Sequence, residues 1–163
     1  MRAVTVIEGG VNILDVEIPK PKNNEVLVKV FSCGLNRADL MVADGGAHGS
    51  AGGSGTIVGM EFSGEVIEFG NDVTNLSVGD RVMCSGTSAW AEYAVTDWGR
   101  VIKIPDNNMD FITASTLPIA LGTMHNAIVT AGEFLKGQSI LIQGASSGVG
   151  LMGLQIAKNL EAK

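Results

Sequence analysis

The feature that most constrains the fold is a short apolar run that leads through a glycine-rich turn into a helical pattern, late in the 163-residue chain. The run is SILIQ, residues 139–143, and it resembles strands that are buried on both faces of a parallel sheet. GASSGVG follows at residues 144–150, and the residues after it have helical spacing. A strand, a tight turn and a helix in this order predict the start of an α/β domain.

The turn has the composition of a phosphate-binding loop. Gly144, Gly148 and Gly150 allow positive φ and let a pyrophosphate approach the backbone without a Cβ clash. The amides of the first helical turn and the helix dipole favour an anion there, and Ser146 and Ser147 add hydroxyl donors. A tight strand–helix connection without a ligand is the alternative, and the glycines alone do not separate the two.

The chain before this turn has a different character. Strand patterns separated by Gly, Asn, Asp and Pro occupy residues 3–8, 25–34, 61–70, 80–86 and 91–96. Closely spaced strands predict an all-β barrel or sandwich. From Asp110 the spacing becomes helical, and Pro118 separates two helices. We therefore expect an α+β chain with an α/β start: a β domain over residues 1–110, then a helical bridge and one strand–turn–helix unit over residues 111–163.

A glycine-rich segment, GGAHGSAGGSG at residues 45–55, interrupts the β part. One interpretation is a flexible surface loop, and its composition also matches an engineered linker. The other is a loop beside an active site, whose mobility admits varied substrates. His48 lies in this segment, where we expect it to be solvated unless the loop closes on a substrate.

Charge and cysteine content exclude several classes of function. The net charge is −6 and no basic cluster is longer than KPK, so nucleic acid or an anionic membrane is not expected as the main partner. No apolar run is long enough to span a bilayer, and the first residues lack a signal-peptide layout. Cys33 and Cys84 form no Cys-x-x-Cys pair, which favours a reducing compartment. We expect a cytoplasmic protein.

Taken together, the motifs resemble the medium-chain dehydrogenase/reductase superfamily, in particular its zinc-independent quinone oxidoreductase branch, the zeta-crystallin-like group. The matching segments are EVLVKVFSCGLNRADL, VGMEFSGEVIEFGNDVTNLSVGDRV, AEYAV, IPDNNMDFITASTLPIALGTMHNAI and ILIQGASSGVGLMGLQIAK. The resemblance implies a GroES-like β-barrel domain followed by a Rossmann domain, NADPH as hydride donor, and quinones or α,β-unsaturated carbonyls as acceptors. It also implies a homodimer at full length. Because family members are about twice this long, we expect the chain to be truncated after the first strand–helix unit of its cofactor domain.

Two departures from the zinc-dependent relatives define the branch. Those relatives have a Cys ligand where this chain has Asn36, and a His ligand where it has Met60. The loop with four closely spaced cysteines is missing, and the two cysteines and two histidines show no metal-ligand spacing. A similar string, TGASSGxG, opens short-chain dehydrogenases, but there it lies near the N-terminus, whereas here a β domain precedes it. We expect a site without zinc.

Without a metal, negative charge on the acceptor oxygen has to be met by hydrogen-bond donors. The resemblance implies that Asn36 and Asp39 line the nicotinamide cleft, which makes both catalytic candidates. The alternative is that Asn36 is an N-cap and Asp39 is the third residue of a short helix, where its charge favours the helix dipole. Both interpretations can hold together. Tyr93, the only tyrosine, lies in a strand, so protonation by solvent is the simpler expectation.

The resemblance also places Thr123 near the cofactor phosphates and nicotinamide, although a core-facing helix residue is the alternative. We expect His125, two residues on, to be packed rather than a proton donor. The predicted cofactor-binding residues are Asn36, Thr123, Gly144, Ser146, Ser147, Gly148, Val149 and Gly150.

Three functions remain open at this point. The leading one is an NADPH-dependent quinone or enone reductase, and a near neighbour is an enoyl-thioester reductase. The third is a non-catalytic fragment or truncated paralogue without productive cofactor binding. This third interpretation remains open because the first strand of a doubly wound sheet needs neighbouring strands on both sides, and the later sequence of this chain supplies none. The residue that reads the adenosine ribose, about 20 positions past the glycines, would also fall beyond Lys163.

Overall fold

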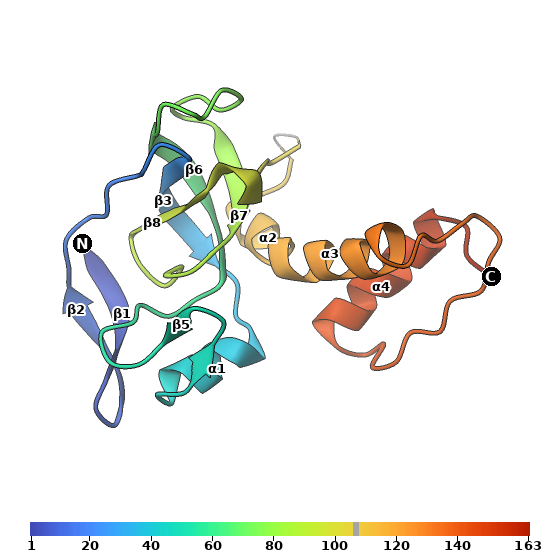
Figure 1. Ribbon diagram of the computed structural model, residues 1–163, viewed down its shortest axis with the longest axis horizontal. Helices are drawn as coiled ribbons and strands as arrows, with labels where there is room; N and C mark the ends of the chain where they lie inside the picture. The colour runs from blue at the N-terminus through green and yellow to red at the C-terminus, as the bar shows by residue number, and fades with distance from the viewer. Residues whose placement is uncertain (106–107) are drawn as a thin grey trace. The chain divides into compact units, whose positions relative to one another are not determined.

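The computed structural model describes residues 1–105 and 108–163, which divide into two compact units, Met1–Thr116 and Leu117–Lys163. The first unit contains all the paired strands of the described residues, and the second contains helices and a long connecting segment. The expected order, a curled β domain first and a helical part after it, is confirmed (Figure 1).

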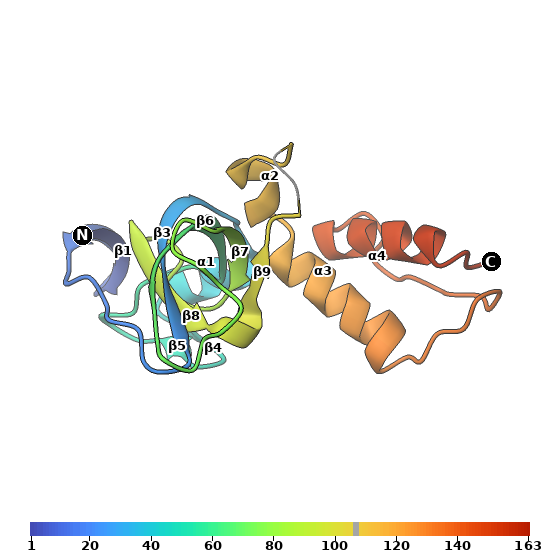
Figure 2. The ribbon, with the colours of Figure 1, turned by 90° about the horizontal axis from the view of Figure 1, so that it is seen from above.

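A five-stranded antiparallel sheet is the framework of the first unit, and it curls on itself as a half-barrel (Figures 1 and 2). Its strand order is β8-β3-β6-β7-β9. The strands are β3 (Glu25–Cys33), β6 (Glu61–Phe69), β7 (Arg81–Ser85), β8 (Tyr93–Asp97) and β9 (Val101–Lys103). Of these, β9 was missed by the sequence patterns, because it is only three residues long and two of them are exposed.

A separate hairpin, β1 (Arg2–Ile7) and β2 (Gly10–Asp15), begins the chain. The β1 backbone is tied to later segments, with Val4 N donating to Trp90 O and Val6 N donating to Thr56 O, both at 2.8 Å. The strand β2 was not predicted, because most of its residues are exposed. Its sequence therefore lacks the alternation of apolar and polar residues that is typical of a strand with one buried face.

Aliphatic side chains fill the interior of the curled sheet. The core contains the fully buried Val26, Val28, Phe62, Val66, Val82, Cys84 and Ala94. A register shift in β3 occurs beside Gly64 of β6, where an added Cβ would overlap the Lys29 carbonyl oxygen. Since the backbones approach too closely for any side chain at this point, glycine is required there.

The glycine-rich segment contains more order than a flexible loop would have. The short helix α1 (Arg37–Ala43) precedes it, and residues Ala47–His48 (β4) and Ala51–Gly52 (β5) pair as a small hairpin against α1. Thr56 Oγ1 donates to Gly52 O at 2.7 Å and closes the segment. A Cβ on Gly52 would lie 2.8 Å from the Cβ of Ala47, so the hairpin needs glycine at that position.

The helix α2 (Phe111–Ser115) packs on β3, β6 and β7 and therefore belongs to the first unit. Asp110 caps its start by accepting from Thr113 N at 2.7 Å. The rings of Phe31 and Phe111 stack with centroids 4.8 Å apart, and this contact holds the helix on the sheet.

The second unit consists of two helices and the segment between them. Helix α3 (Pro118–His125) continues into a π-helical turn, η2 (Asn126–Thr130), and packs against α4 (Gly148–Asn159). Pro118 at the first position of α3 confirms the predicted break, because proline fits the first turn of a helix and not its interior. No helix of the described residues is both long enough and apolar enough to cross a membrane.

The strand predicted at residues 139–143 does not form, which corrects the sequence expectation. These residues have no regular structure, and Leu141 is 87% exposed. A strand exists only through hydrogen bonds to a neighbouring strand, and no other strand lies in this unit within the described residues. The apolar pattern therefore identifies a segment suited to a sheet, whereas the pairing that would make it a strand is absent from this unit.

Candidate functional site

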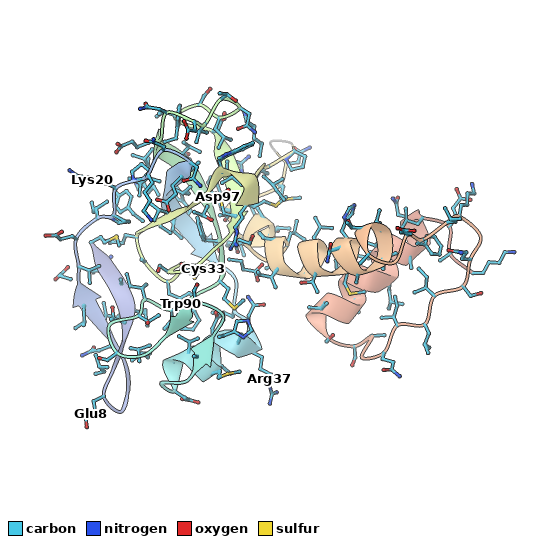
Figure 3. All side chains as sticks on the ribbon, in the orientation of Figure 1. Glu8, Lys20, Cys33, Arg37, Trp90 and Asp97 are labelled. Carbon is cyan, nitrogen blue, oxygen red and sulfur yellow. The ribbon has the colours of Figure 1, made fainter. Side chains whose placement is uncertain are left out.

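The first group of predicted site residues lies at the start of α1. Asn36 is the N-cap, with φ −119° and ψ 151°, and its backbone N donates to Asp39 Oδ2 at 2.7 Å. In this capping-box motif the Asp39 carboxylate satisfies the Asn36 backbone amide, which would otherwise lack a partner. The N-cap interpretation of Asn36 and Asp39 is confirmed. Figure 3 shows Arg37, the next residue, extending away from the sheet into solvent.

A buried acid, Glu61, fixes the orientation of the Asn36 amide. Asn36 Nδ2 donates to Glu61 Oε1 at 2.8 Å, and Glu61 is only 4% exposed. Gly34 makes room for it, because a Cβ there would lie 2.6 Å from Glu61 Cγ. An amide carries two N–H donors, so the one that Glu61 does not use can serve an acceptor oxygen. Sequence reasoning missed Glu61; its only signal was its place after Met60 in the motif GMEFSG.

Asp39 is buried with an exposure of 1%, although it carries a carboxyl group. Burial raises the pKa of Asp39, and its hydrogen bond from Asn36 N and the charge of His48 oppose this. Burial also raises the pKa of Cys33, and the Asp39 charge adds to the effect. Asp39 Oδ1 has no hydrogen-bond partner among the described residues. A buried acceptor without a partner is costly, so this oxygen is a candidate to meet a ligand or a proton.

A cavity of about 260 Å³ in the first unit is lined by Asp39, Met60, His48 and Arg100, among others. The glycine-rich segment therefore lies beside the predicted catalytic Asp39, in agreement with the second interpretation of that segment. Within residues 1–105 and 108–163, no group of three or more His, Cys, Asp or Glu side chains is arranged to hold a metal ion.

The second group lies at the glycine turn before α4. Ser147 is the N-cap: its Oγ accepts from Gly150 N at 3.0 Å and donates to Gly144 O at 2.8 Å. Gly144 has φ +67°, the left-handed conformation that favours glycine. The Ser147 hydroxyl is therefore engaged in shaping the turn rather than pointing to an outside group.

Two glycines of this turn differ in the space around them. A Cβ on Gly150 would lie 2.7 Å from Ala145 Cα, so this glycine is required by packing within the turn. A Cβ on Gly148 would meet nothing within 4 Å, and Gly148 opens a 12-residue helix, whose first amides have no partner within the helix. The space at Gly148, combined with the dipole of a helix of this length, fits an anionic group such as a phosphate.

A cavity of about 500 Å³ in the second unit brings three of the predicted cofactor residues together: Ser147, Val149 and Gly150. Residues 138–143, including the unpaired apolar run, line the same cavity. The cavity is not lined by Thr123, which is exposed on α3, or by Ser146. His125, at the end of α3, is exposed, so the expectation of a packed histidine is wrong.

The predicted site residues therefore fall into two groups, one in each unit. Asn36 and Asp39 belong to the first unit, together with Glu61 and His48. Thr123 and the turn residues belong to the second. The first group offers an oriented amide and a buried carboxyl group, and the second offers a capped helix start with open space in front of it.

Comparison with known proteins identifies the family of the chain. The alcohol dehydrogenase GroES-like domain matches residues 22–106. Human quinone oxidoreductase is 33% identical over 165 residues, which covers 97% of this chain and 50% of that protein. The chain thus spans about half the length of the curated relatives it matches.

Two solved structures are similar over nearly the whole chain. The CurK enoyl reductase superposes with a TM-score of 0.87 at 25% identity, covering 99% of this chain and 52% of that one. A mycobacterial protein solved in complex with NADPH superposes with a TM-score of 0.82 at 26% identity, covering 100% of this chain and 51% of that one.

Proposed function

Because the chain belongs to the alcohol dehydrogenase GroES-like family, in the quinone oxidoreductase branch of the medium-chain dehydrogenase/reductase superfamily, we propose that it is the N-terminal part of a zinc-independent, NADPH-dependent reductase. The acceptors are quinones or α,β-unsaturated carbonyls. The observation that carries the proposal is the pair of local structures on one chain: the Glu61-oriented Asn36 amide and the Ser147-capped glycine turn.

The proposed cofactor-binding domain, a Rossmann domain, covers the chain from residue 111 onward and so includes the whole second unit, Leu117–Lys163. Gly148 and Val149, at the open start of α4, hold the pyrophosphate, and Gly144 and Gly150 shape the turn, with Ser147 as its cap. Ser146 and Thr123 are exposed and contribute hydroxyl groups to the cofactor. When it is bound, NADPH supplies the hydride.

The proposed acceptor-binding domain covers residues 1–110 and so lies within the first unit, Met1–Thr116. Hydride addition leaves negative charge on the acceptor oxygen, and the remaining Asn36 N–H donor meets that charge. Glu61 keeps the amide in position, and Asp39 fixes the start of α1. Asn36 and Met60 occupy the positions where zinc-dependent relatives have ligands, so the Asn36 N–H donor acts in place of a Lewis acid.

The remaining properties follow from this assignment. The partner is a small-molecule quinone or enone rather than nucleic acid or a membrane, in keeping with the net charge of −6. The complete protein is a cytoplasmic homodimer.

Two further candidates each have an observation in their favour. An enoyl-thioester reductase is favoured by the similarity to the CurK enoyl reductase. A non-catalytic fragment or truncated paralogue is favoured by residues 139–143, which form no strand in the second unit.

The test of the reductase is oxidation of NADPH by the complete protein, followed by the near-ultraviolet absorbance of NADPH, with 1,4-benzoquinone, cyclohex-2-enone or an enoyl thioester as acceptor. Asn36→Ala should lower kcat by about 100-fold, the typical effect of losing one donor to a developing oxyanion. Arg37→Ala, next in sequence and exposed, is the matched control and should retain the rate. Absence of NADPH oxidation with every acceptor rules out the proposal, and the preferred acceptor separates the first two candidates.

Calorimetry separates the third candidate. A non-catalytic chain should show negligible heat on titration with NADPH, because its turn has no adjoining sheet to complete the site. Micromolar binding that is lost when Gly148 is replaced by Val eliminates the non-catalytic interpretation.

A further inference from the structure

The cavity of about 260 Å³ in the first unit gathers ionisable side chains from three different elements. Asp39 comes from α1, His48 from β4, and Arg100 from the 3-10 turn η1 (Trp98–Arg100). These are the only ionisable residues among those that line it in the described part of the chain. A cavity with convergent polar groups is the usual form of a small-molecule site.

Asp39 gives this cavity a buried polar wall. Its exposure is 1%, and its Oδ2 atom accepts from Asn36 N at 2.7 Å. Its Oδ1 atom is buried and lacks a partner among the described residues. Burial raises the pKa of Asp39, and the charge of His48 lowers it, so a protonated His48 stabilises the ionised carboxylate.

The glycine-rich segment holds His48 at this cavity. His48 pairs with Ala51 in the β4–β5 hairpin, and the hairpin packs against α1, the helix that carries Asp39. The side chain of His48 is exposed, so its ring can contact a ligand in the cavity and still exchange protons with water.

The other ionisable side chains near Asp39 and His48 are less suited to donate a proton to a ligand in this cavity. Arg100 lines the cavity but keeps its charge at any ordinary pH, so it can stabilise an oxyanion and cannot protonate it. Cys33 responds to the charge of Asp39 but does not line the cavity. Tyr93, the only tyrosine, is not among the lining residues either. An ordinary imidazole is the group that exchanges a proton near neutral pH.

We propose that His48 is the proton donor of the reduction, and that Asp39, on the wall of the same cavity, is the positioning residue whose charge draws the protonated His48 ring toward the acceptor. This inference rests on the proposed reductase function and replaces solvent as the expected proton source. It also gives the glycine-rich hairpin a role, since the hairpin sets the position of His48.

The step balances for an enone acceptor. The hydride, which NADPH would supply with its own oxidation to NADP⁺, forms a C–H bond at the β-carbon. The C=C π pair shifts to the bond between the α-carbon and the carbonyl carbon, and the C=O π pair moves to the oxygen to give an enolate. The N–H bond of protonated His48 then breaks, its proton forms the O–H bond of the enol, and a neutral imidazole remains. Water returns a proton to the ring, and the enol converts to the saturated ketone.

The test is an NMR titration of the protein with cyclohexanone, an unreactive ketone, with the histidine ring signals as the readout. The chain has two histidines, so His125 on α3 is an internal control. We expect the His48 ring signals to shift saturably and those of His125 to stay in place. His48→Gln should weaken ketone binding by about tenfold, the effect of losing one charge-assisted hydrogen bond, while His125→Gln leaves it unchanged.

The role of Asp39 has its own readout. Asp39→Asn keeps an acceptor for Asn36 N–H and removes the negative charge. It should weaken the response of the His48 ring signals to cyclohexanone, with the His125 signals unaffected. Asp44→Asn, at the end of α1 and outside this cavity, is the matched control and should change neither ring. Equal responses to Asp39→Asn and Asp44→Asn overturn the positioning role.

The wild-type titration needs no variant to fold, and it needs no NADPH. A His48 ring that does not respond to cyclohexanone overturns the proton donor, even where NADPH oxidation is intact. Absence of NADPH oxidation with a responsive His48 overturns the proposed reductase function instead, and with it the proton-donation step.

Discussion

The two units of the chain differ in how their backbone groups are paired. In the first unit, β3 lies between β6 and β8 and pairs with both, and Val28 at its centre is fully buried. In the second unit, the segment between η2 and α4 makes local turns, such as Gln138 N to Leu135 O at 3.1 Å. Among the described residues of that unit, the buried apolar side chains are those of Pro118, Ile128 and Ala157.

This contrast shows which structural information is local and which is not. The β unit contains both partners of each strand pair, so its pattern of apolar residues becomes a sheet with a core. The second unit contains an equally apolar run, residues 139–143, yet no partner strand within it. We infer that the first unit is stable by itself and that the second is stable only locally, through its helices.

The largest expected effect is loss of the β core. Phe62→Ala on β6 removes a fully buried ring and should lower the free energy of unfolding of the first unit by about 3–5 kcal/mol. Both tryptophans, Trp90 and Trp98, lie in that unit, so their fluorescence in a urea titration reports on it alone. Leu141→Ala, at a residue 87% exposed in the second unit, is the control and should leave the transition unchanged. Equal effects of the two would remove the distinction between the units.

Replacing a glycine with alanine should change the stability of the two units in opposite directions. Gly64→Ala places a Cβ 2.9 Å from the Val28 side chain and against the Lys29 carbonyl, and should cost about 2 kcal/mol or more. Gly122→Ala on α3 meets nothing within 4 Å and should stabilise its helix by about 0.5–1 kcal/mol. Urea titration measures the first effect and thermal circular dichroism the second. A destabilising Gly122→Ala would show that α3 is packed more tightly than described.

The cap of α4 tests whether the second unit is held by local interactions. Ser147→Ala removes the acceptor for Gly150 N and should destabilise the helix by about 1 kcal/mol, which lowers the helical signal in circular dichroism. Ser146→Ala, whose hydroxyl is not part of the cap, is the matched control. An unchanged signal in both variants would mean that contacts other than the cap hold the glycine turn.

The smallest effect concerns Asp39 and depends on pH. Burial raises its pKa in the folded state, so the folded protein binds a proton more readily than the unfolded chain does. The penalty of burying the charge is therefore present above the folded-state pKa and relieved as the pH falls through it. Asp39→Asn should stabilise the first unit at neutral pH, and the gain should shrink toward acidic pH. Urea titrations of Trp fluorescence at several pH values measure this, and a gain independent of pH would assign it to another cause.

Much of the first unit could be predicted from the sequence. Five strands follow from the alternation of apolar residues and from the turn residues between them, and the N-cap at Asn36 follows from capping preferences. All of these signals act over a few residues. The exposed β2 and the short β9 could not be found, because they bury too little to leave a pattern. The hairpin β4–β5 could not be predicted, because its sequence is rich in glycine, which is as common in ordered tight turns as in flexible loops.

The candidate site could be predicted only in part, for a related reason. Asn36 and Asp39 stand in one motif, and the glycine turn in another, so local spacing reveals both. Glu61 reaches Asn36 from a strand 25 residues away, and His48 reaches the same cavity as Asp39 from a hairpin. Contacts of this kind depend on strand pairing and burial, which a single sequence does not display.

The measurement that tests the contrast most directly is native-state hydrogen exchange of the two apolar runs in one sample. We expect the amides of residues 26–30 in β3 to exchange only by unfolding of the whole β unit, because both of their neighbouring strands are in place. The amides of residues 139–143 should exchange near the rate of an unstructured chain. Comparable protection of the two runs would contradict the account, because it would mean that the glycine turn already follows a paired strand.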